Sequence, residues 1–286
     1  MMSNALAILK QPVTAPVALY FTIGPLISLL IAYLAGVFDE RELHSPDRLA
    51  EDRQPGNLLL IFLAGLAVWI LAPTIYLAYH TGPGTTTQRA VQISRQEEVT
   101  LGGIASALGI LVLCVGNAVY RRDGLRRLGL SGRRLMEAIP RGIIGIIAIM
   151  PILTWIAFAA QEIWQSTTSQ QPAKHEVLQM LAQTHDPVRQ AALVFMAVVI
   201  APVFEELLFR GHLQTLLRHF LRSPIWAILL TSIAFALVHR PIWTWPPIFF
   251  LSLCLGYAYE RRGNLWLSMV IHALFNGISI AASYYV

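Results

Sequence analysis

The sequence predicts an all-α integral membrane protein, a polytopic bundle of about eight membrane-spanning helices. Hydrophobic residues make up 56% of its 286 residues and charged residues only 13%, and the mean hydropathy is +0.58, far from the balance of a soluble domain. Stretches of about 20 apolar residues, the length that crosses a bilayer core, recur along the chain. They lack the alternating pattern of barrel strands, and lipid cannot satisfy an open backbone, so helices are predicted.

Eight apolar segments follow one another, separated by short polar stretches. The first two enclose a loop, 37–56, that carries charges of both signs and is typical of a solvated surface. The sixth and seventh segments are the shortest, and their spanning role is the least well supported. The segments cover residues 15–36, 57–79, 101–120, 142–164, 191–209, 225–239, 246–259 and 265–285.

The distribution of basic residues predicts the orientation of these helices. Seven arginines occupy the loop 121–141, whereas the loop 165–187 holds a single lysine, Lys174. Cytoplasmic loops carry the excess of Lys and Arg, so the first loop is predicted to be cytoplasmic and the second not. Counting spans outward from there puts both termini on the non-cytoplasmic side of a cell membrane.

The net charge of +5 comes from basic residues that lie mainly between apolar segments, which indicates topology and not nucleic-acid binding. Two regions are expected. Residues 1–140 are expected to form an N-terminal accessory region of about three spans with the Arg-rich loop, and residues 141–286 a second transmembrane region. This division rests on the residues described next, all of which lie in the second half.

The fifth apolar segment contains the most informative residues of the chain. In APVFEELLFRG, the carboxylates of Glu205 and Glu206 follow an unbroken apolar run, and an acidic side chain near the centre of a spanning helix costs about 2.5–3.5 kcal/mol to insert. Glu206 stands four residues before Arg210, the favourable order for an ion pair on one helix face. We therefore expect Glu206 to be paired and Glu205 to be the freer carboxylate, although an interfacial ion pair is the simpler alternative.

Two later segments add polar residues at helical spacing. Phe235 and His239 share a face of the sixth segment, and His272 and Asn276 share a face of the last. Taken alone, His239 is typical of an interfacial histidine, and the His272 and Asn276 pair of a hydrogen bond between packed helices. Together with the glutamates they provide the groups that activate water and stabilise an oxyanion.

The three patterns, E-E-x-x-x-R (Glu205, Glu206, Arg210), F-x-x-x-H (Phe235, His239) and H-x-x-x-N (His272, Asn276), resemble the motifs of the CPBP family of intramembrane proteases, the CAAX endopeptidase and bacteriocin-processing (Abi) family. The resemblance covers residues 186–286. It implies an α-helical protease in which Glu205 and His239 activate water and His272 and Asn276 stabilise the oxyanion. Glu206 and Arg210 would support Glu205, with Phe235 beside them.

The expected activity is hydrolysis of a peptide bond in a membrane-associated protein or peptide, in a cavity opening toward the cytoplasm. No metal is expected to be obligatory, although Glu205, His239 and His272 are residue types that also bind zinc. Two other classes stay open: a non-catalytic bacteriocin-immunity or scaffold protein of the same fold, and a proton-coupled transporter, for which intramembrane Glu and His are also typical.

Overall fold

The computed structural model describes residues 55–80, 87–120, 124–173 and 176–284, together with Ile23, Gly24, Leu26, Ile27 and Leu30. Within these residues the regular structure is helical and there is no strand, so the all-α prediction is confirmed for them. Most of the first predicted span, 15–36, and nearly all of the loop 37–56 lie outside the described residues.

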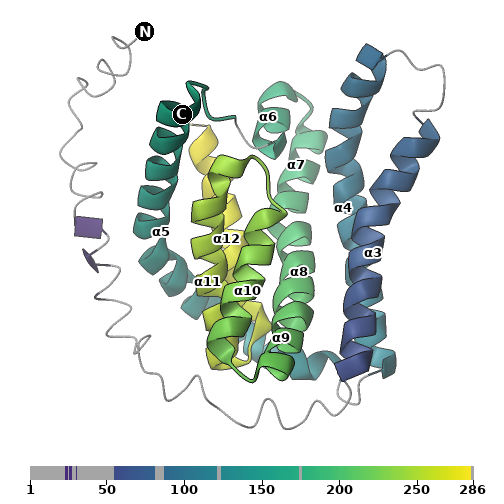
Figure 1. Ribbon diagram of the computed structural model, residues 1–286, viewed down its shortest axis with the longest axis vertical. Coiled ribbons are helices and arrows are strands. Elements are labelled where there is room, and N and C mark those ends of the chain that lie inside the picture. Colours follow the sequence, from purple (N-terminus) through teal and green to yellow (C-terminus); the bar gives the residue numbers. More distant parts are fainter. Residues whose placement is uncertain are drawn as a thin grey trace.

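The described helices stand side by side in a bundle (Figure 1). Helices α3 and α4 form one edge, α5 forms the other, and the segments bearing the predicted site residues lie between them. The elements are α3 (Pro55–His80), α4 (Thr87–Tyr120), η3 (Gly124–Leu128), α5 (Gly132–Thr168), α6 (Glu176–Gln183), α7 (Pro187–Phe195), η4 (Met196–Ile200), α8 (Ala201–Glu206), η5 (Leu207–Gln214), α9 (Thr215–Leu221), α10 (Pro224–Leu237), η6 (Ile242–Thr244), α11 (Trp245–Arg262) and α12 (Leu265–Ser283).

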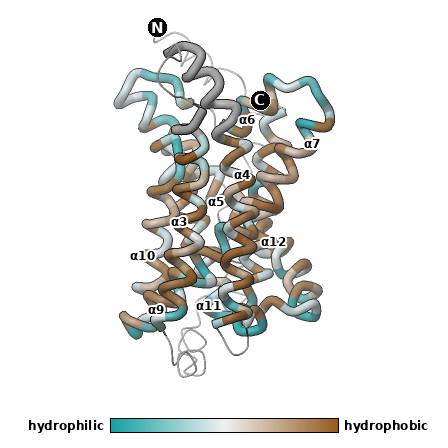
Figure 2. The backbone as a smooth tube through the Cα atoms, turned by 90° about the vertical axis from the view of Figure 1, so that its right-hand side faces the viewer, coloured by the Kyte–Doolittle hydropathy of each residue, from teal (hydrophilic) through white to brown (hydrophobic). Residues whose placement is uncertain are grey.

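Among the described residues, five helical stretches are long and apolar enough to cross a membrane: Pro55–Tyr76, Val99–Tyr120, Gly124–Thr168, Pro187–Leu221 and Leu265–Ser283. Helix α10 is apolar but shorter. Figure 2 shows hydrophobic residues along the middle of the helices and hydrophilic ones gathered toward the two ends. Large apolar side chains point outward on the outer helices, as expected of a surface that faces lipid.

The segment from Pro187 to Leu221 is one continuous helical rod made of α7, η4, α8, η5 and α9. Two stretches of π-helix, η4 and η5, flank the turn that carries the glutamates. At about 1.5 Å per residue, 35 residues extend about 50 Å, so Glu205 lies near the middle of the rod. Because the rod continues well past Arg210, Glu205 sits deep in the bundle.

Helices α3 and α4 pack against this rod through a shared apolar core. Ile61 of α3 and Leu113 of α4 are buried in one cluster with Phe204 and Leu207. Gly109 of α4 lies directly over the ring of Phe204, where a Cβ would come within 2.3 Å of a ring carbon. This close approach fixes the position of the residue that precedes Glu205.

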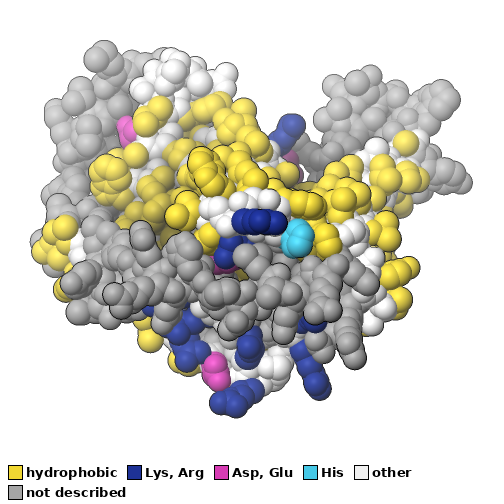
Figure 3. All heavy atoms as spheres, turned by 60° about the horizontal axis from the view of Figure 1, so that its bottom comes forward, with side chains coloured by type: hydrophobic (Ala, Val, Ile, Leu, Met, Phe, Trp, Pro, Cys, Tyr) yellow, Lys and Arg dark blue, Asp and Glu magenta, His cyan; other side chains and the backbone are white. Residues whose placement is uncertain are grey.

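Many of the described arginines gather at one end of the bundle, which we call the Arg-rich end, whereas Arg240 lies at the other end. There, the guanidinium of Arg134 donates to the carbonyl of Gly263, and Asn264 Nδ2 donates to the carbonyl of Arg134 at 2.9 Å. Arg218 pairs with Glu260 at 2.8 Å. These contacts join the start of α5, the end of α9 and the turn between α11 and α12, and Figure 3 shows blue Lys and Arg side chains on this face.

Candidate active site in the helix core

The adjacent glutamates of α8 have different environments. Glu206 is fully buried and its Oε1 accepts a hydrogen bond of 2.8 Å from Arg210, whose side chain is also fully buried. Arg210 also donates to the carbonyl and hydroxyl oxygens of Ser252 on α11, at 3.1 and 2.7 Å, and lies over the ring of Phe235. The predicted Glu206–Arg210 pairing is confirmed. The guanidinium of Arg210, the carboxylate of Glu206 and the ring of Phe235 are buried together. The ion pair is therefore held in one position and supports the neighbouring residues.

His272 of α12 connects the two glutamates. Its Nδ1 lies 2.9 Å from Glu206 Oε1, and since that carboxylate is already paired with Arg210 it is the acceptor and Nδ1–H the donor. The other ring nitrogen, Nε2, faces Glu205 with 3.7 Å between it and Oε2. Glu206 therefore determines both the orientation of the imidazole and the tautomer in its neutral form.

His239 reaches Glu205 from the other side. Its Nδ1 lies 2.6 Å from the carbonyl oxygen of Phe235, one turn earlier in the chain, so Nδ1 carries the proton and donates it. Its Nε2 is 3.8 Å from Glu205 Oε2. The ring of Phe235 packs against both imidazoles, with centroid separations of 4.6 Å to His239 and 5.8 Å to His272.

Glu205 Oε2 thus lies between two imidazole nitrogens that carry lone pairs when the rings are neutral. A carboxylate and two such nitrogens are all acceptors, and at 3.7–3.8 Å they make no direct hydrogen bond with one another. The arrangement is completed by a species that supplies hydrogens, such as water or a proton. This is what a general base with an assisting imidazole requires.

A cavity of about 430 Å³ adjoins these groups, lined by Trp69, Glu176, Glu205, Phe209, Val238, His239 and Arg240. Glu176 begins α6 and Arg240 follows α10, and both side chains are exposed, so the cavity reaches the surface beside them. These elements lie at the end of the bundle opposite the Arg-rich end, because α10 begins beside Arg222 and runs away from it (Figure 1). The cavity and the Arg-rich end thus lie at opposite ends of the bundle, so the two expectations of a cavity open to the cytoplasm and an Arg-rich loop in the cytoplasm exclude each other.

Comparison with known families matches the part of the chain that carries these groups. Residues 187–278 match the family of type II CAAX prenyl endopeptidase Rce1-like proteins. These residues form an Rce1-like, or CPBP, domain. UPF0177 protein YxdF of Lactococcus lactis subsp. lactis (strain IL1403) is 34% identical over 86 residues, which are 29% of this chain and 46% of that protein. The chain thus aligns with less than half of that relative, and no solved structure matches it.

Asn276 is placed differently from the other predicted site residues of the Rce1-like domain. Its Nδ2 donates a 2.8 Å hydrogen bond to the carbonyl of Ala197. That carbonyl lacks its usual helical donor, because the N–H of Ala201 bonds to Met196 instead and the next residue, Pro202, has no N–H. The structure thus brings Glu205, His239 and His272 together, and commits one N–H of Asn276 to the backbone of the rod.

The candidate site of the Rce1-like domain contains side chains of the kinds that bind metal ions. Within the described part of the chain, no group of three or more His, Cys, Asp and Glu side chains is arranged to hold a metal ion. Glu205, His239 and His272 are nevertheless suitable residue types, with Glu205 Oε2 3.7–3.8 Å from both Nε2 atoms.

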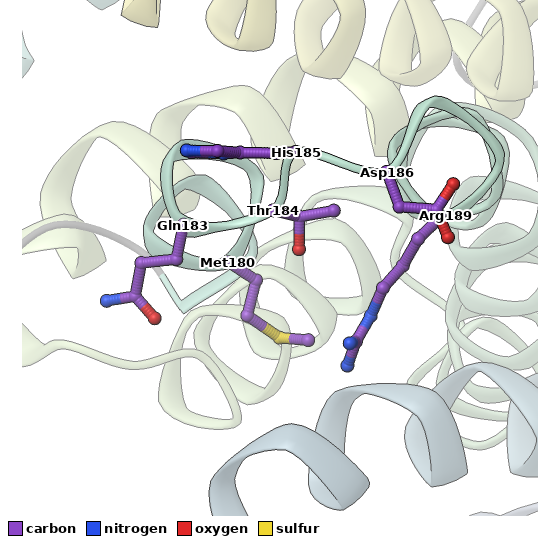
Figure 4. Close-up of a pocket in the computed structure, with 6 residues that line it drawn as sticks. All are labelled: Met180, Gln183, Thr184, His185, Asp186 and Arg189. Carbon is purple, nitrogen blue, oxygen red and sulfur yellow. The ribbon is translucent and has the colours of Figure 1, made fainter.

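A second cavity, of about 220 Å³, lies outside this site at the turn between α6 and α7. Figure 4 shows Asp186 and Arg189 on one side of it and Met180 and Gln183 on the other. The side chain of Asp186 caps α7 by accepting from the N–H of Val188 at 3.0 Å. Asp186 therefore has a structural role at this turn, as the N-cap of α7.

Two residues near the Rce1-like site were missed by the sequence analysis. Ser252 accepts a hydrogen bond from the guanidinium of Arg210. A small hydroxyl inside an apolar helix is a sequence signal that could have identified Ser252 as a buried hydrogen-bonding partner. Trp69 lines the cavity from α3, far away in the sequence. Its position among other apolar residues carries no local signal.

Proposed function

We propose that the chain is an intramembrane endopeptidase that hydrolyses a peptide bond of a membrane-associated protein or peptide. The observation that carries the proposal is the convergence of Glu205 Oε2 with the Nε2 atoms of His239 and His272 beside a cavity that reaches the surface. Membership of residues 187–278 in the Rce1-like family supports it.

In the proposed reaction, Glu205 binds a water molecule and takes one of its protons while the water oxygen attacks the substrate carbonyl carbon. His239 accepts the second hydrogen of that water through Nε2, since its Nδ1–H is held by a backbone carbonyl. The proton on Glu205 then passes to the leaving amine as the C–N bond breaks. The second proton of the water passes by way of His239 Nε2 from the product carboxyl group to the released amine. The products are therefore a carboxylate and an ammonium group, and the carboxylate of Glu205 is regenerated.

Negative charge develops on the carbonyl oxygen in the transition state and needs donors. His272, when protonated on Nε2, supplies one, and its positive charge is stabilised by the carboxylate of Glu206. Asn276 has a second N–H besides the one given to Ala197 and supplies another. In this scheme Glu206, Arg210 and Phe235 are positioning residues.

We also propose eight spans, which adds the first apolar segment, α10 and α11 to the five long apolar stretches, with the Arg-rich end in the cytoplasm and both termini outside. The gathering of arginines at one end supports this orientation. Substrate would then enter from the non-cytoplasmic side, past Glu176 and Arg240.

With Cys114 and Cys254 replaced by Ala, we expect Glu176→Cys to react with an impermeant maleimide in intact cells and Gly132→Cys only after permeabilisation. The reverse pattern would overturn the orientation.

The activity is tested by cleavage of a quenched-fluorescence peptide library by the detergent-purified protein. Glu205→Gln and His239→Ala should each lower cleavage at least about a hundredfold, in the range for loss of a general base. Glu137→Gln, which removes an exposed carboxylate on α5, is the matched control and should keep full activity. A parallel series with a strong chelator tests the proposal that no metal is obligatory.

If the folded wild-type protein cleaves no lipidated or unlipidated peptide, the non-catalytic scaffold or immunity role becomes the better interpretation. Ion-dependent uptake into proteoliposomes in that case would indicate a transporter. If cleavage is present and survives Glu205→Gln, the proposed roles are wrong even though the protein is a protease.

A further inference from the structure

Two residues that line the cavity beside Glu205, Trp69 and Glu176, lie outside the Rce1-like domain. Trp69 comes from α3, more than one hundred residues before the first residue of the matched segment, 187–278. Its ring packs on that of Phe204, with centroids 5.7 Å apart and planes inclined by 45°. Trp69 therefore touches the residue immediately before Glu205 and the cavity at the same time.

Helix α3 is held firmly enough to keep this indole in place. Gly65 of α3 lies against Leu113 of α4, and Gly116 of α4 lies against Ile61, so the two helices approach closely. Helix α4 is in turn linked to the rod by a buried contact of 2.9 Å between Asn117 Nδ2 and His212 Nε2. Small residues at such contacts are a typical means of joining membrane helices.

The opposite face of α3 looks outward. Ile70, Leu71 and Ile75 are 51%, 52% and 65% exposed, as expected of side chains in lipid. Trp69 is only partly exposed and points to the cavity side. Helix α3 thus separates the cavity from lipid, and Trp69 is an aromatic side chain that it contributes to the cavity wall.

The composition of the cavity suggests what it takes up. The wall near Glu205 includes the partly exposed ring of Trp69 and the buried ring of Phe209, whereas Val238 (47% exposed), Glu176 and Arg240 line the cavity at the surface. A volume of about 430 Å³ lies within the usual range of ligand pockets, about 300–1,000 Å³. It has room for a large side chain with adjoining backbone.

We propose that Trp69, with Phe209 and Val238, forms the subsite for a large apolar or aromatic substrate side chain next to the cleaved bond. The inference rests on the proposed peptidase function, because that function makes the bound side chain part of a substrate. The binding of the side chain rests on the cavity itself. It gives the N-terminal region a definite role, because α3 completes a site whose reacting groups lie in the Rce1-like domain.

Binding is measured first, without any turnover. In full-length Glu205→Gln protein, we compare two fluorescein-labelled hexapeptides, one of six alanines and one with a central Phe. The Phe peptide should bind about tenfold more tightly, in the range expected for burying an aromatic ring against others. Adding Trp69→Ala should reduce this preference to about twofold. Ile70→Ala, one residue further along α3 and facing outward, is the matched control and should retain it.

Selectivity is measured second, in the active protein. For the best peptide of the library, the ratio of kcat/KM between Phe and Ala next to the cleaved bond should fall about fivefold in Trp69→Ala, mainly through KM, and recover in Trp69→Phe. A variant that only damaged the fold would lower kcat/KM for both peptides equally and leave the ratio unchanged. That result, or unchanged Phe preference in binding, would overturn the proposal.

The two arms separate this inference from the peptidase function. If no peptide is cleaved but the Phe preference depends on Trp69, the subsite stands and the proposed reaction fails. If peptides are cleaved in a Glu205-dependent manner and the preference for Phe does not depend on Trp69, the proposed reaction stands and the proposed subsite is wrong.

Discussion

The hydrogen bond from Asn276 to Ala197 can be tested through the proline that makes it necessary. In the rod, the carbonyl of Ala197 has no helical donor, because Ala201 N–H bonds to Met196 and Pro202 has none. Hydrogen bonds between membrane helices average only about 0.6 kcal/mol, with a maximum of about 1.7, since a freed group usually finds another partner. Here the helix offers no such partner, so Asn276→Ala should cost about 1.5 kcal/mol in the free energy of unfolding.

Pro202→Ala restores an N–H one turn beyond Ala197, where it can serve that carbonyl through a π-type bond. In this background Asn276→Ala should cost about 0.6 kcal/mol or less, which gives a coupling of about 1 kcal/mol in a double-mutant cycle. The free energy of unfolding is measured by titrating the protein with SDS in mixed micelles. Ser279→Ala is the control on the same helix, because its hydroxyl bonds only locally, to Phe275.

Equal costs of Asn276→Ala in the two backgrounds would refute the link to Pro202. The same four proteins also separate two roles in catalysis. If Asn276 acts only by holding the rod, Pro202→Ala should restore most of the activity that Asn276→Ala removes. If its second N–H stabilises the oxyanion, a loss of about 10²–10³-fold should persist in both backgrounds.

Three further substitutions test the support of the site. Arg210→Met should destabilise the protein by about 3–5 kcal/mol, because it leaves the buried carboxylate of Glu206 uncompensated, and SDS titration measures it. Ser252→Ala should cost about 1–3 kcal/mol in the same assay, since it removes one charge-assisted hydrogen bond to Arg210. Gly109→Ala should cost about 1–3 kcal/mol by displacing the ring of Phe204, and should lower peptide cleavage too, whereas Gly102→Ala, whose Cβ meets nothing, should change neither.

The part of the site that the sequence predicted depends on local geometry. The spacing of four between Glu206 and Arg210 guarantees a shared helix face, and the absence of other cations nearby left Glu205 as the freer acid. The same reasoning placed Phe235 beneath His239. Such inferences need only the period of the helix, so they hold whichever way the helices pack.

The depth of Glu205 was harder to derive. Arg210 looks like the polar end of a membrane span, and a span ending there would leave Glu205 and His239 at different depths. In the structure Arg210 is fully buried, with its charge shared between Glu206, Ser252 and the ring of Phe235. An arginine marks a membrane boundary only when it lacks buried partners, and those partners come from other helices.

The role of α3 and the direction of the cavity depend on packing between segments distant in sequence. Trp69 resembles the other apolar residues around it, and only the contact with Phe204 distinguishes it. The cavity opens beside Glu176, at the start of α6, and a 3.0 Å hydrogen bond from Trp243 of η6 to the carbonyl of Ala173 joins η6 to the chain just before α6. No periodic pattern encodes such a contact, so the sequence predicts the reacting groups better than the surfaces that present a substrate to them.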